Sequence, residues 1–253
     1  MIPQTQRTLR RAARFEGIGL HTGAPCTLHL LPAPPGSGLR FVRTDLPDRP
    51  SIPVRPESAS VKSRRLRRTV LAAGGAEVHT VEHVLAAVSG LALDNLVLEM
   101  SALEAPEPAD GSARALVARL LEAGIEDQGV PRDFAVITEP LFLEEEGVQI
   151  VGTPHPGLRL SFTIQYPNPV VGTQHLSIDM TPEAFAEQVA PARTFALWED
   201  LEALRAAGMI KGGTLENAVV VRGHEVLNQD GLRFPDEFVR HKILDLLGDL
   251  AVL

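Results

Sequence analysis

The stretch from His79 to Leu96, HTVEHVLAAVSGLALDNL, decides how the first half of the chain folds. Its apolar residues recur at i, i+3, i+4 and i+7, at Val81, Val84, Leu85 and Val88. This period predicts a helix with one apolar stripe, and Thr80, just before the repeat, is predicted to be its N-cap. DNLVLEM, residues 94–100, is an apolar run typical of a short strand. The stretch therefore predicts a helix packed beside a sheet.

Strand and helix patterns continue along the chain in two blocks. The first block has strand patterns at residues 26–31 and 38–43 and a second helix pattern at residues 111–124. After EDQGVPRD, residues 126–133, which is polar and aperiodic, the pattern restarts. The second block has strand patterns at residues 134–143, 147–152, 158–166 and 217–223, and helix patterns at residues 181–190, 198–208 and from Pro235 onward. These patterns predict two α+β domains, residues 1–128 and 129–253, joined near residue 129.

Composition excludes some classes of protein. The net charge of -8 over 253 residues argues against a nucleic-acid binder, which needs a basic surface to neutralise phosphates. The single cysteine, Cys26, and the lack of a signal-peptide pattern or a bilayer-spanning run predict a cytoplasmic protein without a membrane span. The basic cluster KSRRLRR, residues 62–68, is compatible with peripheral contact with an anionic membrane, although such runs more often form a solvated loop.

The segment HTVEH, residues 79–83, permits two interpretations. Taken literally it is H-x-x-E-H, a zinc-peptidase motif in which both histidines bind the metal. If Thr80 caps the helix, however, His79 precedes it and the required i, i+4 geometry is lost. Glu82 and His83 would then lie in the first turn, pointing away from the apolar stripe. The peptidase interpretation is kept as an alternative.

A second set of polar residues lies in DEFVRHKILDLLGDL, residues 236–250. On a helix one face would carry Val239, Ile243, Leu246 and Leu250, and the opposite face would carry His241, Asp245 and Asp249. A histidine at i and an aspartate at i+4 can share one metal ion. Together with His83 they would supply three ligands, the number that a catalytic zinc keeps while leaving a position for water. Glu82, next to one ligand, would be the natural base.

With these motifs in view, the chain resembles the UDP-3-O-acyl-N-acetylglucosamine deacetylases, the zinc enzymes that commit Gram-negative bacteria to lipid A synthesis. The shared motifs, in order, are GIGLHTG (17–23), HTVEHVLAAVSGLALDNL (79–96), APEPADGSA (105–113), ARTFALWEDLEAL (192–204) and GLRFPDEFVRHKILDLLGDL (231–250). The resemblance covers essentially the whole chain. It implies two similar α+β domains, each a small, mostly antiparallel sheet with helices, packed as a β-α-α-β sandwich. We also expect Zn²⁺ as the cofactor, a UDP-linked acylated glucosamine as the substrate, and a monomer.

The resemblance also implies roles for individual residues. It makes His83, His241 and Asp245 the zinc ligands and Glu82 the general base. It places Thr194 beside the oxyanion of the tetrahedral intermediate, and Asp249 where an aspartate orients a catalytic histidine. The implied substrate contacts are His21, Phe195 and Lys242.

At its C-terminal end the chain departs from the family pattern. The family's general acid is a histidine that follows the G-D-L motif in a K-S-G-H segment, whereas this sequence ends on GDLAVL at Leu253. We therefore expect that the acid is absent from this chain and that the chain is cut short. A catalytically inactive homologue that binds a nucleotide sugar is a further alternative.

Overall fold

The computed structural model describes residues 2–60 and 68–253. Its strands are β1 (Thr5–Leu9), β2 (Ala13–Ile18), β3 (Pro25–Pro32), β4 (Leu39–Arg43), β5 (Ser51–Pro53), β6 (Val70–Ala73), β7 (Ala76–His79), β8 (Leu96–Met100), β9 (Ile125–Pro131), β10 (Leu141–Glu145), β11 (Val148–Gly152), β12 (Arg159–Gln165), β13 (Thr173–Asp179), β14 (Phe195–Leu197), β15 (Val219–Arg222) and β16 (Glu225–Val226). Its helices are η1 (Pro56–Ser58), α2 (Glu82–Gly90), α3 (Arg114–Ala123), α4 (Pro182–Ala184), η2 (Phe185–Val189), α5 (Trp198–Ala206) and α6 (Glu237–Leu250).

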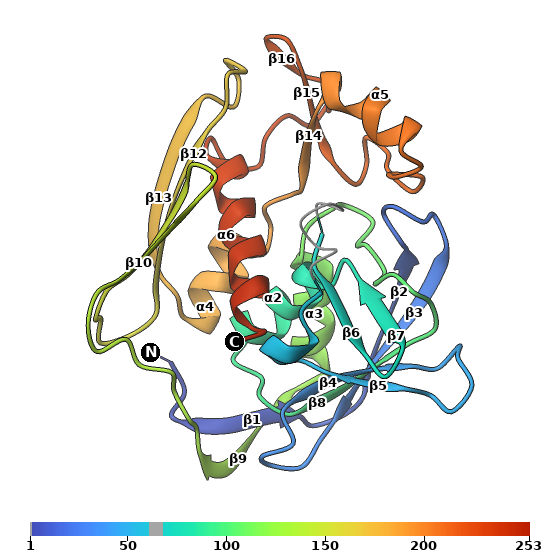
Figure 1. Cartoon of the computed structure of the whole chain (residues 1–253), viewed down its shortest axis with the longest axis vertical. Coiled ribbons are helices and arrows are strands. Elements are labelled where there is room, and N and C mark those ends of the chain that lie inside the picture. The colour runs from blue at the N-terminus through green and yellow to red at the C-terminus, as the bar shows by residue number, and fades with distance from the viewer. Residues whose placement is uncertain (1, 61–67) are drawn as a thin grey trace.

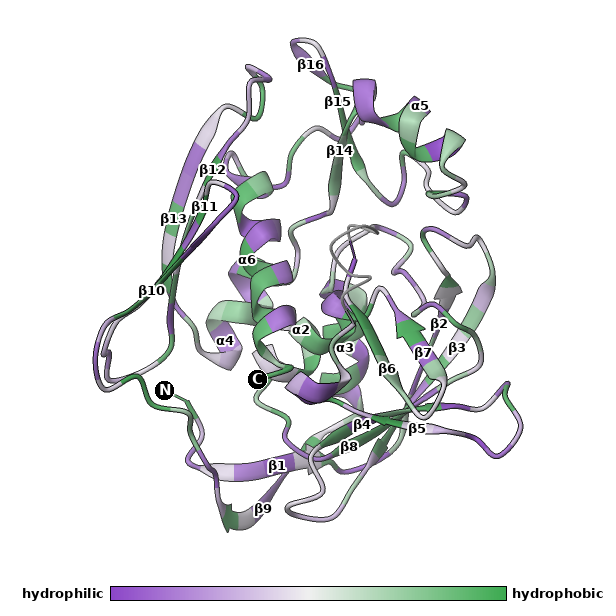
Figure 2. Ribbon diagram, viewed as in Figure 1, coloured by the Kyte–Doolittle hydropathy of each residue, from purple (hydrophilic) through white to green (hydrophobic). Residues whose placement is uncertain are grey.

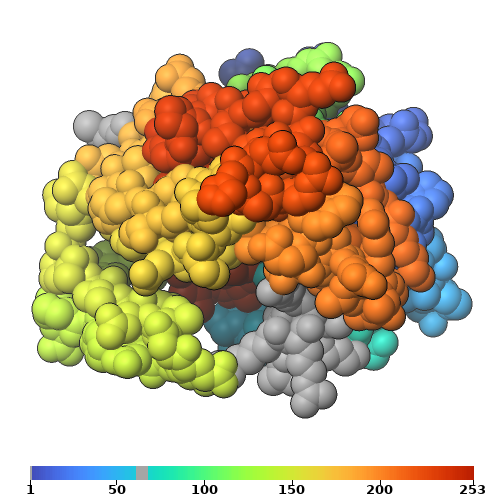
Figure 3. All heavy atoms as spheres, turned by 90° about the horizontal axis from the view of Figure 1, so that it is seen from above, coloured from blue at the N-terminus to red at the C-terminus, as the bar shows by residue number. Residues whose placement is uncertain are grey.

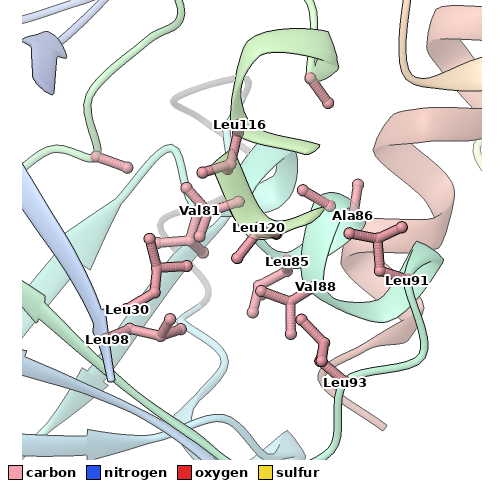
Figure 4. Close-up of a cluster of buried hydrophobic side chains, with 14 of the residues drawn as sticks. Leu30, Val81, Leu85, Ala86, Val88, Leu91, Leu93, Leu98, Leu116 and Leu120 are labelled. Carbon is pink, nitrogen blue, oxygen red and sulfur yellow. The ribbon is translucent and has the colours of Figure 1, made fainter. Parts of the chain in front are cut away.

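The largest sheet has the strand order β2-β3-β8-β4-β5, antiparallel except where β4 pairs with β8. Helices α2 and α3 cover one of its faces (Figure 1). In the close-up of Figure 4, side chains of both helices meet side chains of β3 and β8. The labelled members of this core are Leu30, Val81, Leu85, Ala86, Val88, Leu91, Leu93, Leu98, Leu116 and Leu120. The sequence prediction of a helix packed on a sheet is therefore confirmed.

The other side of α2 packs against α6, and α6 in turn lies against the β12–β13 hairpin (Figure 1). The layers therefore follow one another as the five-stranded sheet, helices α2 and α3, helix α6, and the β12–β13 hairpin. This order confirms the predicted α+β sandwich. One apolar core runs through all four layers, because the same cluster contains Leu30 of the sheet, Leu85 of α2, Leu247 of α6 and Ile178 of β13. Among the described residues, no helix has the length and apolar character that crossing a bilayer requires.

The segment expected to be an irregular connector is a strand. Residues Ile125–Pro131 form β9, which pairs antiparallel with β1 near the N-terminus. Polar strands of this kind are specified by their partner rather than by a local apolar period. The division into residues 1–128 and 129–253 stays a prediction, with its boundary inside β9. The predicted membrane contact through KSRRLRR involves residues 62–67, which lie outside the described residues.

Two details of the predicted helices need correction. Val81, not Thr80, is the N-cap of α2, and no side chain caps that end. In α6 the face expected to be apolar includes Leu250, which is 37% exposed, while Leu244 and Leu247 on other faces are buried. Helix α6 has neighbours on two sides, so one apolar stripe does not describe its burial. At α4, by contrast, the Thr181 side chain accepts a hydrogen bond from the backbone N–H of Ala184, as a cap does.

The β10–β11 hairpin carries apolar side chains that remain exposed. Figure 2 shows these strands largely green, and in Figure 3 the same residues form a yellow-green ridge at the edge of the molecule. The exposed set is Leu141, Phe142, Leu143, Val148, Ile150 and Val151. Among the described residues this hairpin is a sheet of two strands only, so neither strand pairs with a third one.

Candidate metal centre

The start of α2 is held by a buried carboxylate that lies far along the sequence. Thr80 has a left-handed backbone, with φ at 55°, which is uncommon for a residue other than glycine. Its hydroxyl donates to Glu104 at 2.7 Å, and Glu104 also accepts the backbone N–H groups of His21 and Thr22 at 3.0 and 2.7 Å. Glu104 therefore links the GIGLHTG loop to the turn that opens α2.

Three predicted ligands converge between α2 and α6. Nε2 of His83 lies 3.4 Å from Oδ1 of Asp245, and Nε2 of His241 lies 3.3 Å from the same oxygen. One ligand atom from each of the three residues lies within 4.8 Å of the others. The two imidazole rings meet edge to face, 5.0 Å apart between centroids. Side chains from two distant segments thus form one compact cluster.

The donor set fits a tetrahedral zinc ion. Ligand atoms about 2.0–2.1 Å from one tetrahedral ion lie about 3.3 Å from one another, which matches the two nitrogen–oxygen distances above. The far nitrogens of both rings are also held, since Nδ1 of His83 faces Glu107 and Nδ1 of His241 faces the carbonyl oxygen of Ala192, each at 3.1 Å. When Nδ1 carries the proton and donates it in a hydrogen bond, Nε2 is unprotonated and its lone pair can bind a metal ion.

Burial and neighbouring charge shift the pKa values of this cluster. Burial lowers the pKa of His241 to about 4, so its imidazole is neutral at pH 7. Burial also works to lower the pKa of His83, but Glu107 and Asp245 raise it well above its usual value. Burial likewise opposes ionisation of Asp245, yet Lys242 and His241 hold its pKa well below its usual value. The cluster therefore keeps a carboxylate beside two imidazoles.

Glu82 and Asp249 are joined by Thr69. The backbone N–H of Thr69 donates to Oε2 of Glu82 at 3.0 Å, and its hydroxyl donates to Oδ1 of Asp249. Burial raises the pKa of Glu82 to about 7, with His83 opposing the shift and Asp245 adding to it. Burial also raises the pKa of Asp249. The predicted base thus lies beside a predicted ligand, with one oxygen already engaged.

Of the predicted substrate contacts, Lys242 and Phe195 lie beside the cluster. Nζ of Lys242 donates to Oδ2 of Asp245 at 2.8 Å and lies 5.6 Å from the centre of the Phe195 ring. That ring also packs edge to face on Phe238 and Tyr166. Asp245 therefore directs one oxygen to the histidines and the other to a lysine.

His21 and Thr194 are placed less directly. His21 is buried and interacts electrostatically with His83, and burial lowers its pKa to about 4. Its Nδ1 has no hydrogen-bond partner among the described residues. Thr194 lies two residues beyond Ala192, whose carbonyl faces His241, and its backbone pairs with Gly111 and Val219 at 2.8 Å each.

The geometry disfavours the literal peptidase motif. His79 ends β7, and its Nε2 lies 3.0 Å from Oε2 of Glu77. Within residues 2–60 and 68–253, the group that could hold a metal contains His83 but not His79. The left-handed turn at Thr80 separates the two histidines, so they do not share one helical face.

Sequence reasoning missed Glu107, Glu104 and Thr69. Both glutamates belong to SALEAPEPADGS, where no helical or strand period marks a function. Glu107 contacts His83, and Glu104 contacts Thr80, in each case 24 residues away in the sequence. Glu104 also contacts the GIGLHTG loop, which is further away. A buried carboxylate needs such a partner, but the sequence alone does not identify it.

Comparisons with known proteins identify the family of the chain. The sequence model of the family described as UDP-3-O-acyl N-acetylglycosamine deacetylase matches residues 6–253. Proteins of the name UDP-3-O-acyl-N-acetylglucosamine deacetylase are similar to the chain. The one from Bdellovibrio bacteriovorus is 44% identical over 98% of this chain and 81% of its own length. Those from Myxococcus xanthus and Chromobacterium violaceum are 44% and 40% identical over 98% of this chain, covering 77% and 81% of their own lengths. This chain belongs to the UDP-3-O-acyl N-acetylglycosamine deacetylase family.

Proposed function

We propose that this chain is a zinc-dependent deacetylase that removes the N-acetyl group of a UDP-linked, 3-O-acylated N-acetylglucosamine and releases acetate. The observation that carries the proposal is the convergence of His83, His241 and Asp245, with Glu82 directly before the first of them. The names of the relatives support the substrate. In this proposal the reaction is the committed step of lipid A synthesis, carried out by a monomer in the cytoplasm.

His83 and His241 would hold the ion through Nε2, and Asp245 through Oδ1. A zinc ion bound there would polarise the amide carbonyl and lower the pKa of a bound water towards neutrality. The hydrogen bonds of Glu107 and Ala192 to the far ring nitrogens support this assignment, because they orient both imidazoles.

Glu82 would accept the proton of the attacking water. Its Oε2 already accepts the N–H of Thr69, which leaves Oε1 for the water. Thr194 would donate its hydroxyl to the carbonyl oxygen as negative charge develops there. The departing amine must gain a proton, and Glu82, having accepted one, is a carboxyl group beside the cluster that can carry it.

Lys242, Phe195 and His21 would contact the substrate. Lys242 offers a cation beside the cluster, a suitable partner for a diphosphate, and the Phe195 ring offers an apolar surface next to it. The resemblance gives Asp249 the place of an aspartate that orients a catalytic histidine, and in the described residues Asp249 accepts the hydroxyl of Thr69.

The test combines metal content with acetate release. We expect about one zinc per chain, lost in His241→Ala and kept in His79→Ala, since only the former belongs to the cluster. Glu82→Gln should keep its metal and lose about 10²–10⁴-fold in kcat, the range of a general base. Near wild-type turnover in Glu82→Gln would refute this mechanism. Loss of zinc in His79→Ala instead would favour the peptidase interpretation, and substrate binding without a single turnover would indicate an inactive homologue.

A further inference from the structure

The two histidines of the cluster are held from behind by different groups. Both carboxylate oxygens of Glu107 lie 3.1 Å from Nδ1 of His83, whereas Nδ1 of His241 faces the neutral backbone carbonyl of Ala192. A carboxylate behind a metal-binding imidazole fixes the ring and raises its basicity as a ligand, because it adds a negative charge to the hydrogen bond. The two ligands therefore differ in their electrostatic support.

We propose that Glu107 is a positioning residue for the metal ion, holding the His83 ring with Nε2 towards Asp245 and strengthening the binding of a divalent cation. The proposal rests on the proposed function, since it needs the ion between His83, His241 and Asp245. It adds a residue to which neither the motif resemblance nor the metal-binding pattern gave a role.

The surroundings of Glu107 support this role. The residue is 4% exposed, and among the described residues the hydrogen bonds and ion pair of its carboxylate all go to His83. A buried carboxylate without a cationic or donating partner is costly. Within the described part of the chain, the Glu107 side chain is therefore committed to His83.

The backbone of Glu107 is fixed by the GIGLHTG motif. Its N–H donates to the carbonyl oxygen of Ile18 at 3.0 Å, and the two residues form an isolated bridge beside β2. A Cβ atom on Gly17 would lie only 2.5 Å from the Glu107 carbonyl oxygen, so only glycine permits this approach. The edge of the first sheet thus sets the position of the carboxylate that reaches His83.

The test measures zinc affinity by competition with a chromophoric chelator, using the full 253-residue chain. Glu107→Ala removes the acceptor and the charge, and Glu107→Gln keeps an oxygen that can accept from Nδ1 but removes the charge. We expect Glu107→Ala to weaken zinc binding about 10–100-fold, and Glu107→Gln to fall between it and wild type. Glu77→Gln is the matched control, because Glu77 makes the same kind of contact, at 3.0 Å, with a histidine outside the cluster.

The outcomes separate this inference from the proposed function. A wild-type chain that binds no zinc would overturn both. If the wild-type chain, Glu107→Ala and Glu107→Gln all bind zinc with the same affinity, the role of Glu107 is refuted and the proposed function is not. Thermal unfolding of the metal-free variants identifies a merely structural role, in which stability falls while the zinc affinity of the folded protein is unchanged. That result would also refute the proposal. If Glu107→Ala does not fold, the zinc affinity of Glu107→Gln, which is close in shape to the native residue, is compared with that of wild type.

Discussion

At the scale of single residues, the candidate centre depends on polar groups that lie behind the proposed ligands and the proposed base. Glu104 fixes the turn before α2, and Thr69 engages one oxygen of Glu82. Glu107 holds the far nitrogen of His83. Each contact satisfies a buried polar atom that would otherwise cost free energy, and each also limits the orientation of a functional group. The same hydrogen bonds therefore stabilise the fold and orient the groups of the proposed chemistry.

Thr69→Val tests the link between Asp249 and the predicted base. The valine keeps the backbone N–H that binds Glu82 but removes the hydroxyl that binds Asp249, so the start of β6 is less firmly held. We expect kcat to fall about tenfold, because small displacements of a catalytic group are costly, while zinc content stays unchanged. Acetate release and elemental analysis provide the two measurements. Thr69→Ser keeps a hydroxyl and should retain most activity, and an equal loss in both variants would contradict this explanation.

Sequence reasoning identified the residues that converge but not the residues that support them. His241 and Asp245 could be selected by their i, i+4 spacing, and His83 by its place next to Glu82 in the first turn of a predicted helix. The motif resemblance implied all three as ligands. Thr80 was assigned as an N-cap by a local rule, whereas Glu104, 24 residues away, takes its hydroxyl. Contacts of this kind are fixed by tertiary structure, which a local pattern does not contain.

At the scale of secondary structure, the centre exists because α2 and α6 approach closely. Gly248 of α6 faces the backbone of Glu82, and a Cβ atom there would overlap with the Glu82 carbonyl oxygen. The glycine lies one turn beyond Asp245, so it allows the two helices to approach each other next to the proposed ligands. Glycine is unfavourable within a helix, so its presence here is explained by the close approach of α6 to α2 and not by the stability of α6 itself.

Gly248→Ala is therefore expected to have an effect opposite to helix propensity. Alanine would favour an isolated helix by about 1 kcal/mol, but here its methyl group must push α6 away from α2. We expect a net loss of about 1–3 kcal/mol in the free energy of unfolding, together with weaker zinc binding. Chemical denaturation and the chelator competition measure the two effects. Gly157→Ala is the control, because a Cβ atom there meets nothing within 4 Å. A stabilised Gly248→Ala variant would show that the helices do not need this contact.

The elements found from the sequence are those with a local period. β3, β4, β8, α3 and α5 lie close to their predicted residues, because an apolar face repeats in each. β9 and its partner β1 were missed because IEDQGVP and TQRTL carry few apolar residues. Each of these strands is stabilised by a partner more than a hundred residues away in the sequence, and only the folded chain brings β1 and β9 together.

At the scale of the whole molecule, the two halves of the chain share an apolar core and are joined by partly buried ion pairs, among them Asp110–Arg233 and Asp94–Arg132. The largest apolar cluster contains side chains from both halves, among them Leu85 and Ile243. Arg233 also donates to Asp110 at 2.9 Å, and Asp110 accepts the N–H and hydroxyl of Ser112 at 3.1 and 2.9 Å. We expect the halves to unfold together, because the largest cluster is incomplete without side chains from both of them.

The Asp110–Arg233 pair predicts a dependence of stability on pH. Burial opposes ionisation of Asp110, but Arg233 and Ser112 lower its pKa below the usual value near 4. A lowered pKa in the folded state stabilises the protein above the unfolded-state pKa, and this stabilisation is lost as pH falls through the folded-state value. Asp110→Asn should therefore lower the free energy of unfolding by about 1–3 kcal/mol at pH 7, and its difference from wild type should shrink below about pH 4. Thermal melts of both proteins from pH 3 to pH 8 measure this, and a constant difference across the range would contradict it.

The pairing of β1 with β9 has a consequence for synthesis of the chain. Leu9 pairs with Ile125 and Thr5 with Pro131, so the first strand leaves the ribosome long before its partner does. At about 5–20 residues per second this delay is roughly 6–25 s. During that time the nascent chain carries a strand with unpaired N–H and C=O groups, which can bind a chaperone or a neighbouring nascent chain. Slow codons before residue 125 would lengthen this interval, and fast ones would shorten it.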